Sequence, residues 1–309
     1  MRLCVVSLNP AIDAEWCVED VLWEEKNVVH SQRRWPGGKG VNVARWLKFL
    51  GADSQILIPL GGATGREMRA GLKAQNLRAR VIPLTAETRV NVVVTTARGR
   101  QMRFNPPGPE YNGGEWRAVL SAAKRILAEG AALILSGALP RGLPPDAYAQ
   151  LIRLAHKSSR PVFLDCDGDA LVRGAAARPS LVKPNLHELE CWCGRKLRTP
   201  RAAESAASEL STTTRGWVLL SLGADGALLV NTRESFRAQA RPPHGPVLNT
   251  VGAGDAMLAA AALGFAQGAD PEEWLRTAVG AGTAATRVLA GAFPSHRVLR
   301  ESQRGVRIC

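Results

Sequence analysis

The sequence predicts an α/β protein built on a mainly parallel sheet flanked by helices, with a second, small β-sheet beside it. Residues 2–8 form a nearly continuous apolar run, the pattern of a strand covered on both faces. Such strands then alternate with helical stretches along most of the chain, which is typical of a parallel sheet with crossover helices. Two insertions contain strands with one polar face, which indicates a separate sheet.

The composition is that of a globular protein. Of the 309 residues, 46% are hydrophobic and 22% are charged. Apolar runs such as residues 258–265 are too short to cross a bilayer, and the N-terminus is typical of a buried strand rather than a signal peptide. Six cysteines in a chain of this length make no disulfide framework. We therefore expect a cytoplasmic protein with structural thiols and no membrane partner.

The net charge of +13 raises nucleic acid as a partner. The basic residues are mostly dispersed arginines, however, and few aromatic side chains lie beside them to stack on bases. An arginine-rich proteome, or anionic small substrates, explains the charge at least as well. Nucleic acid stays a minor alternative.

Two insertions, each with two predicted strands, predict the small sheet. Residues 15–21 and 27–35 carry β-branched and aromatic side chains with one polar face, and residues 90–96 and 101–105 form a hairpin about the turn at 97–100. We expect these strands to form a lid assembled from two insertions. The lid then comprises residues 10–36 and 85–107, and the large domain comprises residues 1–9, 37–84 and 108–309.

The remaining segments alternate as a crossover topology requires. Apolar residues at helical spacing follow a glycine-rich loop at 36–40, and Gly51 is of the residue type that ends helices. The predicted strands are 2–8, 56–60, 80–84, 131–136, 162–165, 181–185, 217–222 and 228–230. The predicted helices are 41–50, 64–75, 114–129, 146–157, 256–267 and 272–288.

The stretch Asn249-Thr250-Val251-Gly252-Ala253-Gly254-Asp255 opens one of these helices. Backbone N–H groups at a helix start lack partners and carry partial positive charge, so they bind anions. Asp255 lies at that start, where a carboxylate should have a low pKa and be a weak base. Phosphate oxygens held beside one carboxylate suit phosphoryl transfer to a hydroxyl. The structural alternative is a common N-cap aspartate after a glycine loop.

Polar residues follow several of the predicted parallel strands, at the edge where open α/β sheets bind ligands. They include Asn9, Ser136, Asp165, Lys183 and Ser221. The chain has no Gly-x-x-x-x-Gly-Lys-Ser/Thr loop, and no Gly-x-Gly-x-x-Gly follows the first strand. These absences count against a P-loop nucleotidase and a dinucleotide dehydrogenase.

Together, the motifs resemble the ribokinase/PfkB family of sugar kinases along essentially the whole chain. The resemblance rests on Gly37-Gly38-Lys39-Gly40-Val41-Asn42, on the stretch 249–255, and on Lys183-Pro184-Asn185-Leu186-His187-Glu188, which matches the family's Asn-x-x-Glu element. Leu8-Asn9-Pro10-Ala11-Ile12-Asp13 and Ser221-Leu222-Gly223-Ala224-Asp225-Gly226 are similar to the branch that holds 1-phosphofructokinase and tagatose-6-phosphate kinase.

The resemblance implies a ribokinase-like fold, with a Rossmann-like large domain, and ATP-dependent transfer to a sugar hydroxyl in the cleft below the lid. Asp255 would be the catalytic base, and Gly252, Ala253 and Gly254 would supply N–H donors to the transferring group. Glu188 with Asn185 would organise Mg²⁺ through water. The implied substrate-binding residues are Asp13, Gly37, Gly38, Lys39, Asn42, Arg89, Asn91, Ser136 and Arg141. The implied ATP-binding residues are Lys183, Asn185, Ser221, Gly223 and Gly226.

The branch resemblance implies a ketohexose monophosphate as substrate, with fructose 1-phosphate first and tagatose 6-phosphate or fructose 6-phosphate as alternatives. Lys39 and Arg89 are the candidates for its phosphate group, and an Arg89 directed to bulk solvent would count against this. The chain departs from the branch pattern near the substrate. It has Ala138 for a serine, Arg141 for a proline, Pro106 for an acid, and Asp165-Cys166-Asp167-Gly168 for a run with a small hydroxyl residue.

Two alternatives stay open. The chain could be a kinase for an unphosphorylated sugar or nucleoside, or a non-catalytic sugar or nucleotide sensor. Asp255 and Glu188 favour catalysis, because a sensor needs neither a base nor a metal organiser. We also expect the exposed lid sheet to pair with a copy of itself in a homodimer.

Overall fold

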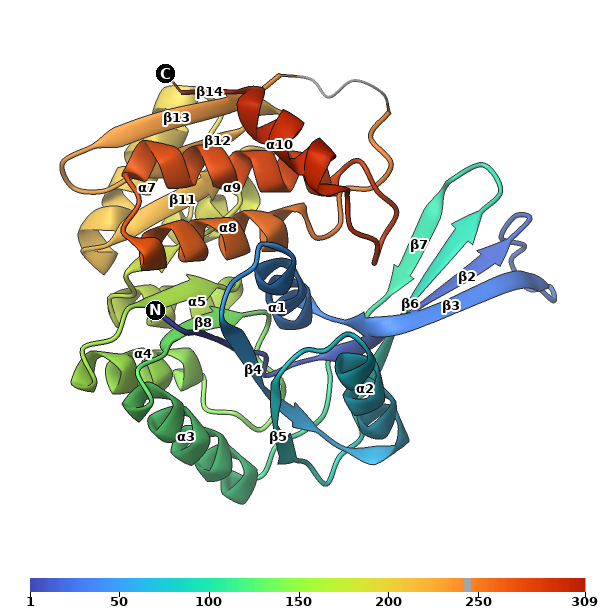
Figure 1. Cartoon of the computed structure of the whole chain (residues 1–309). Helices are drawn as coiled ribbons and strands as arrows, with labels where there is room; N and C mark the ends of the chain where they lie inside the picture. The colour runs from blue at the N-terminus through green and yellow to red at the C-terminus, as the bar shows by residue number, and fades with distance from the viewer. Residues whose placement is uncertain (242–245, 309) are drawn as a thin grey trace.

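The computed structural model describes residues 1–241 and 246–308, and within them the chain forms a ten-stranded and a four-stranded sheet (Figure 1). In the large sheet the strand order is β14-β13-β12-β11-β10-β9-β8-β1-β4-β5. The strands from β5 to β11 in this order are parallel, and β12, β13 and β14 extend the sheet antiparallel, so the predicted mainly parallel sheet is confirmed. The strands are β1 (Leu3–Val6), β4 (Ser54–Leu60), β5 (Ala79–Pro83), β8 (Ala132–Ser136), β9 (Val162–Asp165), β10 (Leu181–Val182), β11 (Trp217–Ser221), β12 (Ala227–Val230), β13 (Ser235–Ala240) and β14 (Val306–Ile308).

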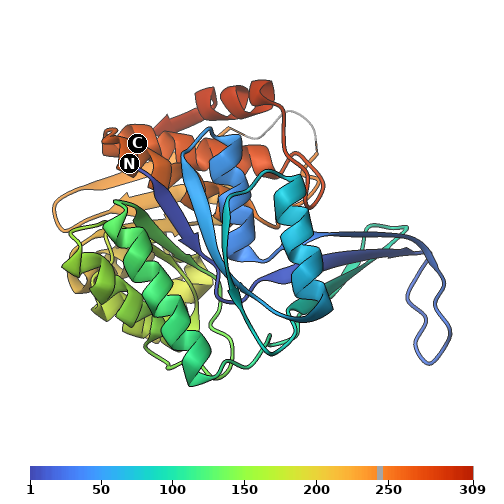
Figure 2. The same ribbon diagram turned by 60° about the horizontal axis from the view of Figure 1, so that its bottom comes forward.

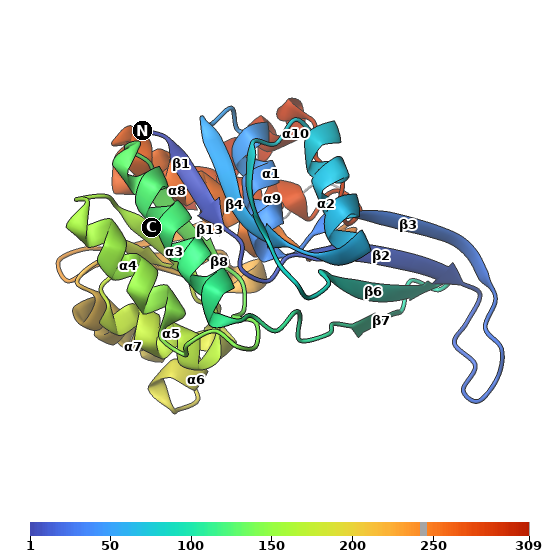
Figure 3. The same ribbon diagram turned by 90° about the horizontal axis from the view of Figure 1, so that it is seen from below.

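Both faces of the large sheet are buried, because successive side chains of a strand point to opposite sides. Leu3 and Val5 of β1 belong to a core with α1, α2, α8, α9 and α10, whereas Cys4 and Val6 belong to a core with α3 to α7. Figure 3 shows these two layers of helices on opposite sides of the sheet. The helices are α1 (Lys39–Phe49), α2 (Gly62–Ala74), α3 (Gly113–Ala128), α4 (Ala147–Lys157), α5 (Gly168–Ala176), α6 (Leu186–Cys193), α7 (Pro200–Thr214), α8 (Ala253–Gln267), α9 (Pro271–Ala285) and α10 (His296–Arg304).

The small sheet, called the lid below, projects from one side of the body, and the loop between β2 and β3 extends beyond it (Figures 1 and 2). Its strand order is β3-β2-β6-β7, from β2 (Ala11–Val18), β3 (Val29–Gly37), β6 (Arg89–Thr96) and β7 (Gln101–Phe104). The predicted hairpin of β6 and β7 is confirmed. Strand β2 begins at Ala11 rather than at Glu15, where the predicted strand began. The additional residues include Ile12 and Ala14, which are buried at the base of the sheet. The domain boundaries given above remain a prediction.

Several elements were not predicted from the sequence, namely α5, α6, α7, α10, β13 and β14. α9 also ends at Ala285 rather than Val288, and the chain beyond it turns toward the lid. No helix among the described residues is long and apolar enough to span a membrane.

Candidate active site

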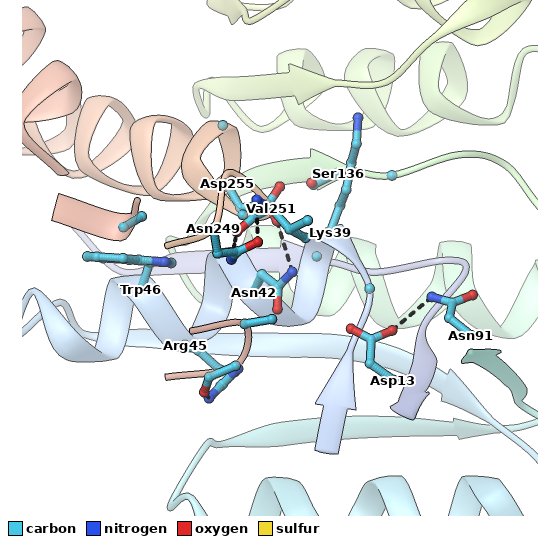
Figure 4. Close-up of a pocket in the computed structure, with 18 of the residues that line it drawn as sticks. Asp13, Lys39, Asn42, Arg45, Trp46, Asn91, Ser136, Asn249, Val251 and Asp255 are labelled. Carbon is cyan, nitrogen blue, oxygen red and sulfur yellow. Dashed lines mark hydrogen bonds between the residues drawn. The ribbon is translucent and has the colours of Figure 1, made fainter. Parts of the chain in front are cut away.

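A pocket of about 660 Å³ lies between the lid and the carboxyl ends of the strands of the large sheet (Figure 4). Ser136, Asp165 and Ser221 are the last residues of β8, β9 and β11, and Lys183 directly follows β10. The sheet edge predicted to bind ligands is therefore part of this pocket. The predicted site residues that line it are Asp13, Gly38, Lys39, Asn42, Arg89, Asn91, Ser136, Lys183, Asn185, Glu188, Ser221, Gly252, Gly254 and Asp255.

The glycine loop places Asp255 in the first turn of α8. Gly252 is the N-cap in the left-handed region (φ 85°), which a side chain disfavours. Asp255 makes no capping hydrogen bond, so the N-cap alternative does not hold. Its carboxylate instead accepts a hydrogen bond from Asn42 Nδ2 at 3.0 Å, across from α1 (Figure 4).

The predicted low pKa of Asp255 is wrong. The side chain is only 5% exposed, and burial, reinforced by the charge of Asp165, raises the pKa of Asp255 to about 6. The Asn42 hydrogen bond and the charges of Lys39 and Lys183 oppose this shift without cancelling it. Asp255 is therefore a stronger base than a helix start alone would make it.

A buried carboxylate, Asp165, joins two lysines beside Asp255. The Nζ atoms of Lys39 and Lys183 each lie 3.5 Å from Asp165 Oδ1, and neither carboxylate oxygen of Asp165 has a hydrogen-bond partner among the described residues. A Cβ on Gly254 would lie 3.3 Å from Lys183 Nζ, so this ammonium group is next to the glycine loop. The sequence placed Asp165 at a strand end but did not identify it as a site residue.

Lys39 also lies 3.6 Å from Glu188 Oε1. Burial alone would lower the pKa of Lys39, but the charges of Asp165 and Glu188 outweigh burial and raise it above its usual value. The ammonium group therefore belongs to an acidic cluster at the strand ends.

Asn185 and Glu188 form a capping box at the start of α6. Asn185 Oδ1 accepts from the Glu188 N–H and Glu188 Oε2 accepts from the Asn185 N–H, both at 2.9 Å. Asn112 and Glu115 form the same box at the start of α3, outside the pocket. The Asn-x-x-Glu spacing is thus a helix start in both places, and only the first faces the pocket.

The residues present at the strand ends suit a hydrated Mg²⁺. Glu188 Oε1 and the oxygens of Asp165, which accept no hydrogen bond among the described residues, are hard ligands that can accept hydrogen bonds from metal-bound water. Asn185 Oδ1 is already used in the capping box. Among the described residues no group of three or more His, Cys, Asp or Glu side chains forms a direct metal cage.

On the lid side, Asn91 Nδ2 donates to Asp13 Oδ1 at 2.8 Å (Figure 4). Burial raises the pKa of Asp13, while the hydrogen bonds from Asn91 and from the Gly38 N–H lower it. Gly37 leaves the space that Asp13 needs, because a Cβ there would lie 2.0 Å from Asp13 Oδ2. Two neighbouring strands and the start of α1 thus hold one carboxylate at the base of the lid.

Arg89 is not directed to bulk solvent. Its guanidinium group donates to the carbonyl groups of Asn9 (3.1 Å) and Pro106 (2.7 Å), which precede and follow lid strands. Its Nε is buried without a hydrogen-bond partner in the described part of the chain. Arg89 and Lys39 both line the pocket, but Lys39 is engaged by carboxylates.

The pocket does not include every predicted residue. The guanidinium group of Arg141 is exposed outside it, and Ala253 donates its N–H to the Thr250 carbonyl at 3.4 Å. A Cβ on Gly226 would overlap the Ala238 carbonyl, which is a packing reason for that glycine. In the described part of the chain, the predicted residues that do not line the pocket are Gly37, Arg141, Gly223, Gly226 and Ala253.

Other lining residues were not predicted from the sequence. Arg45 donates to the Gly291 carbonyl at 2.6 Å and lies over the ring of Phe293, and Trp35 packs on Gly291 from β3. The segment 288–293 therefore closes one side of the pocket between α1 and the lid. Its sequence has no motif that signals this position.

Comparison with known proteins identifies the family. The chain matches the pfkB family of carbohydrate kinases over residues 2–296. It is 32% identical over 279 residues to the 1-phosphofructokinase of Bacillus subtilis, which covers 90% of each chain. It is 35% identical over 289 residues to the ATP-dependent 6-phosphofructokinase isozyme 2 of Escherichia coli, which covers 93% of each chain.

Among solved structures, phosphofructokinase-2 from Escherichia coli in complex with fructose-6-phosphate matches with a TM-score of 0.89 at 32% identity, over 98% of each chain. The protein is therefore an ATP-dependent phosphotransferase with an alcohol group as acceptor and a ribokinase-like fold. The chain belongs to the pfkB family of carbohydrate kinases, as the motifs predicted.

Proposed function

We propose that the protein transfers the γ-phosphoryl group of ATP to a hydroxyl of a ketohexose monophosphate. Fructose 1-phosphate is the first candidate, and tagatose 6-phosphate and fructose 6-phosphate are the alternatives. The observation that carries the proposal is Asp255, a buried carboxylate with a pKa of about 6 at a helix start, facing a pocket with two lysines. Relatives that include phosphofructokinases for either fructose phosphate support the substrate class.

In this proposal Asp255 accepts the proton of the sugar hydroxyl while the oxygen of that hydroxyl forms a bond to the γ-phosphorus of ATP. The bond from that phosphorus to the bridging oxygen breaks, and ADP leaves. Charge on the transferring oxygens is stabilised by the backbone N–H groups of Gly252 and Gly254 and by Lys183, whose ammonium group lies beside Gly254. Asn42 orients the base through its hydrogen bond.

Mg²⁺, when bound, would neutralise part of the phosphate charge, and Glu188 with Asp165 would hold its water ligands. Ser221 lines the same pocket as Val251 and Leu289, and the exposed apolar side chains of Val251 and Leu289 suit the face of a purine. Asp13 and Asn91 are the polar pair that the sugar hydroxyls would meet.

The test is an ADP-release panel over sugars and sugar monophosphates, run on the wild-type enzyme and on Asp255→Asn. We expect turnover of a ketohexose monophosphate and a loss of kcat of at least about a hundredfold in Asp255→Asn, the usual scale for a positioned base. Asp169→Asn makes the same chemical change at an exposed site on α5 and should keep full activity. Wild-type turnover by Asp255→Asn would exclude this mechanism, and turnover of unphosphorylated sugars alone would exclude the substrate class.

We also propose that the lid pairs with the lid of a second copy. Side chains of β2, β6 and β7 alternate, so the residues between those that line the pocket form the outer face. On β2, β6 and β7 that face is apolar, and Trp16 and Phe104 on it are 38% and 52% exposed. Its residues that reach the surface are Trp16, Val92, Val94, Met102 and Phe104. The β3 residues on the same face, Gln32 and Arg34, are polar. An exposed apolar sheet face of this kind favours association.

A further inference from the structure

The cysteine side chains lie in different surroundings. Cys4 and Cys166 are buried, and burial raises the pKa of the Cys4 thiol to about 12 and raises the pKa of the Cys166 thiol as well. Because metal ions bind the thiolate, these two side chains are poor ligands. Among the cysteines that the structure describes, Cys191 on α6 is the exposed one. Its thiol is therefore the one that a dissolved ion can reach.

Cys191 has a second potential ligand beside it. His187 lies four residues earlier, on the same face of α6. Its Nε2 atom faces the Cys191 Sγ atom at 3.7 Å, in hydrogen-bonding geometry, so a ring nitrogen and not a ring carbon is turned to the sulfur. Both side chains are exposed, and within residues 1–241 and 246–308 each has the other as its hydrogen-bond partner. Both donor atoms can therefore bind one ion.

The distance between these two atoms matches that of two ligands of one zinc ion. A tetrahedral zinc ion, with a Zn–S bond of about 2.3 Å and a Zn–N bond of about 2.0–2.1 Å, holds the two donor atoms about 3.6 Å apart. The observed 3.7 Å therefore requires almost no movement of either side chain. A thiolate with an imidazole also favours Zn²⁺ over Mg²⁺, which prefers oxygen ligands. This pair is thus chemically distinct from the carboxylates at the strand ends.

The other donor side chains on α6 are already engaged. Both carboxylate oxygens of Glu190 accept hydrogen bonds, one from a lysine ammonium group at 2.8 Å and one from a backbone N–H at 2.9 Å. The Cys193 Sγ atom donates to two backbone carbonyl groups, both at 3.6 Å. An ion on His187 and Cys191 therefore keeps two positions for water. Such an open site exchanges its ion, whereas a structural zinc site is closed by four protein ligands.

The same part of α6 carries a residue of the candidate active site. Glu188, next to His187 in the sequence, lines the pocket, and its carboxylate lies 3.6 Å from Lys39 Nζ. His187 and Cys191 are not among the residues that line the pocket. Figure 3 shows α6 at the margin of the body, away from the lid. An ion that joins His187 to Cys191 therefore restrains the helical turn that carries Glu188 without entering the pocket.

We propose that His187 and Cys191 form a binding site for Zn²⁺, or for a similar thiol-binding divalent cation, on the outer face of α6. His187 binds through Nε2 as the neutral imidazole, and Cys191 binds as the thiolate, so its thiol proton is released to solvent. Water fills the two remaining positions. The bound ion joins two successive turns of the helix and stabilises the folded protein, because it binds the folded chain in preference to the unfolded one.

The test is a titration with Cd²⁺, whose bond to a thiolate gives an ultraviolet charge-transfer band, in buffer with excess Mg²⁺ to occupy the oxygen ligands of the pocket. We expect a tight phase of one Cd²⁺ per chain, which Zn²⁺ displaces. Cys191→Ser should abolish this phase. His187→Asn should weaken it at least about tenfold, since the loss of even a supporting group costs a metal site that much affinity. Cys193→Ser removes a thiol from the same helix and should bind as the wild type does.

Thermal unfolding gives a second readout. Zn²⁺ should raise the Tm of the wild type and of Cys193→Ser, but not that of His187→Asn or Cys191→Ser. A tight phase that survives in Cys191→Ser would assign the thiolate to another residue, and wild-type affinity in His187→Asn would leave a thiol without a second ligand. Either result overturns the proposal, as would an equal loss of binding in Cys193→Ser. Neither readout needs a sugar or ATP, so the proposed function is tested separately.

Discussion

At Asp255, two local effects act in opposite directions on one carboxylate. The start of a helix favours the charged form, and burial against Asp165 favours the neutral form. Burial prevails, because the pocket walls exclude water from this side chain, which the sequence alone places only at a helix start. The helix start was predictable from the glycines, whereas the depth of burial depends on α1 and the strand ends packing around it.

The pH profile follows from this shift. Below a pKa of about 6 the proposed base is protonated, so kcat/KM should fall about tenfold per pH unit on the acid side. Asn42→Ala removes a hydrogen bond that lowers the pKa of Asp255, so the acid limb should move to higher pH. Profiles of both enzymes from pH 5 to 8 with one substrate check this. The substrate phosphate titrates in the same range but identically for both enzymes, so an unshifted limb in Asn42→Ala would contradict the assignment.

Lys39 shows where prediction from single residues stops. The Gly-Gly-Lys-Gly motif predicted a lysine in a glycine loop that leads into a helix, and in the structure Lys39 is the first residue of α1 and lines the pocket. Its expected role toward the substrate phosphate remains untested, and its neighbours Asp165 and Glu188 come from distant parts of the chain. Lys39 faces these two carboxylates because the end of β9 and the starts of α6 and α1 come together in the folded protein. No local sequence pattern encodes that arrangement.

At the scale of elements, the two capping boxes offer an internal comparison. Glu188 on α6 and Glu115 on α3 are both 9% exposed and occupy the same position in the same motif. Only Glu188 also faces Lys39 and the pocket. A comparison of variants at Glu188 and Glu115 therefore separates the proposed role of Glu188 in catalysis from its role in capping a helix.

Glu188→Gln should raise the Mg²⁺ concentration needed for half-maximal activity at least about tenfold, since it removes the charge that the metal's water ligands would meet. Glu115→Gln should leave that concentration unchanged. Glutamine also completes a capping box, so both variants should lose less than about 1 kcal/mol of unfolding free energy. Activity in a Mg²⁺ titration and thermal unfolding measure the two effects. Equal Mg²⁺ dependence in both variants would leave Glu188 with only a capping role.

Helices and strands were predictable from the sequence where their apolar residues form a continuous run or a clear period. Strands β1, β4, β8, β9 and β11 are apolar on both sides, and their runs are continuous in the sequence. α7, by contrast, is made largely of Ala, Ser and Thr, and β13 contains Arg237 and Gln239, so neither has a strong period. α9 ends early because residues 288–293 leave it to line the pocket, a tertiary requirement that overrides helix propensity.

At the scale of the whole molecule, the position of the site followed from the fold class, because the carboxyl ends of parallel strands meet at one edge. The lid was also predicted, with its hairpin in the right place. The choice of sugar was not predictable. It depends on rows of side chains across four strands, and their register is visible only once β2 is paired with both β3 and β6.

The proposed pairing of lids predicts the oligomeric state. Wild-type protein should sediment as a dimer, and Trp16→Glu, which places a charge on the apolar outer face, should shift it to a monomer. Val172→Glu makes a similar change at another exposed apolar side chain, on α5, and should stay dimeric. Sedimentation velocity over a concentration series measures this. A wild-type monomer at every concentration would exclude the pairing.

The alternation of side chains along β2 means that one strand presents Asp13 to the pocket and Trp16 to the proposed partner. If the lid binds on both sides, substrate and second copy act as effectors of each other, and thermodynamic linkage requires the coupling to be equal in both directions. A substrate that draws the lid inward then tightens assembly, and dilution of the wild-type protein weakens substrate binding by the same factor. The concentration of the protein itself would then tune its catalysis.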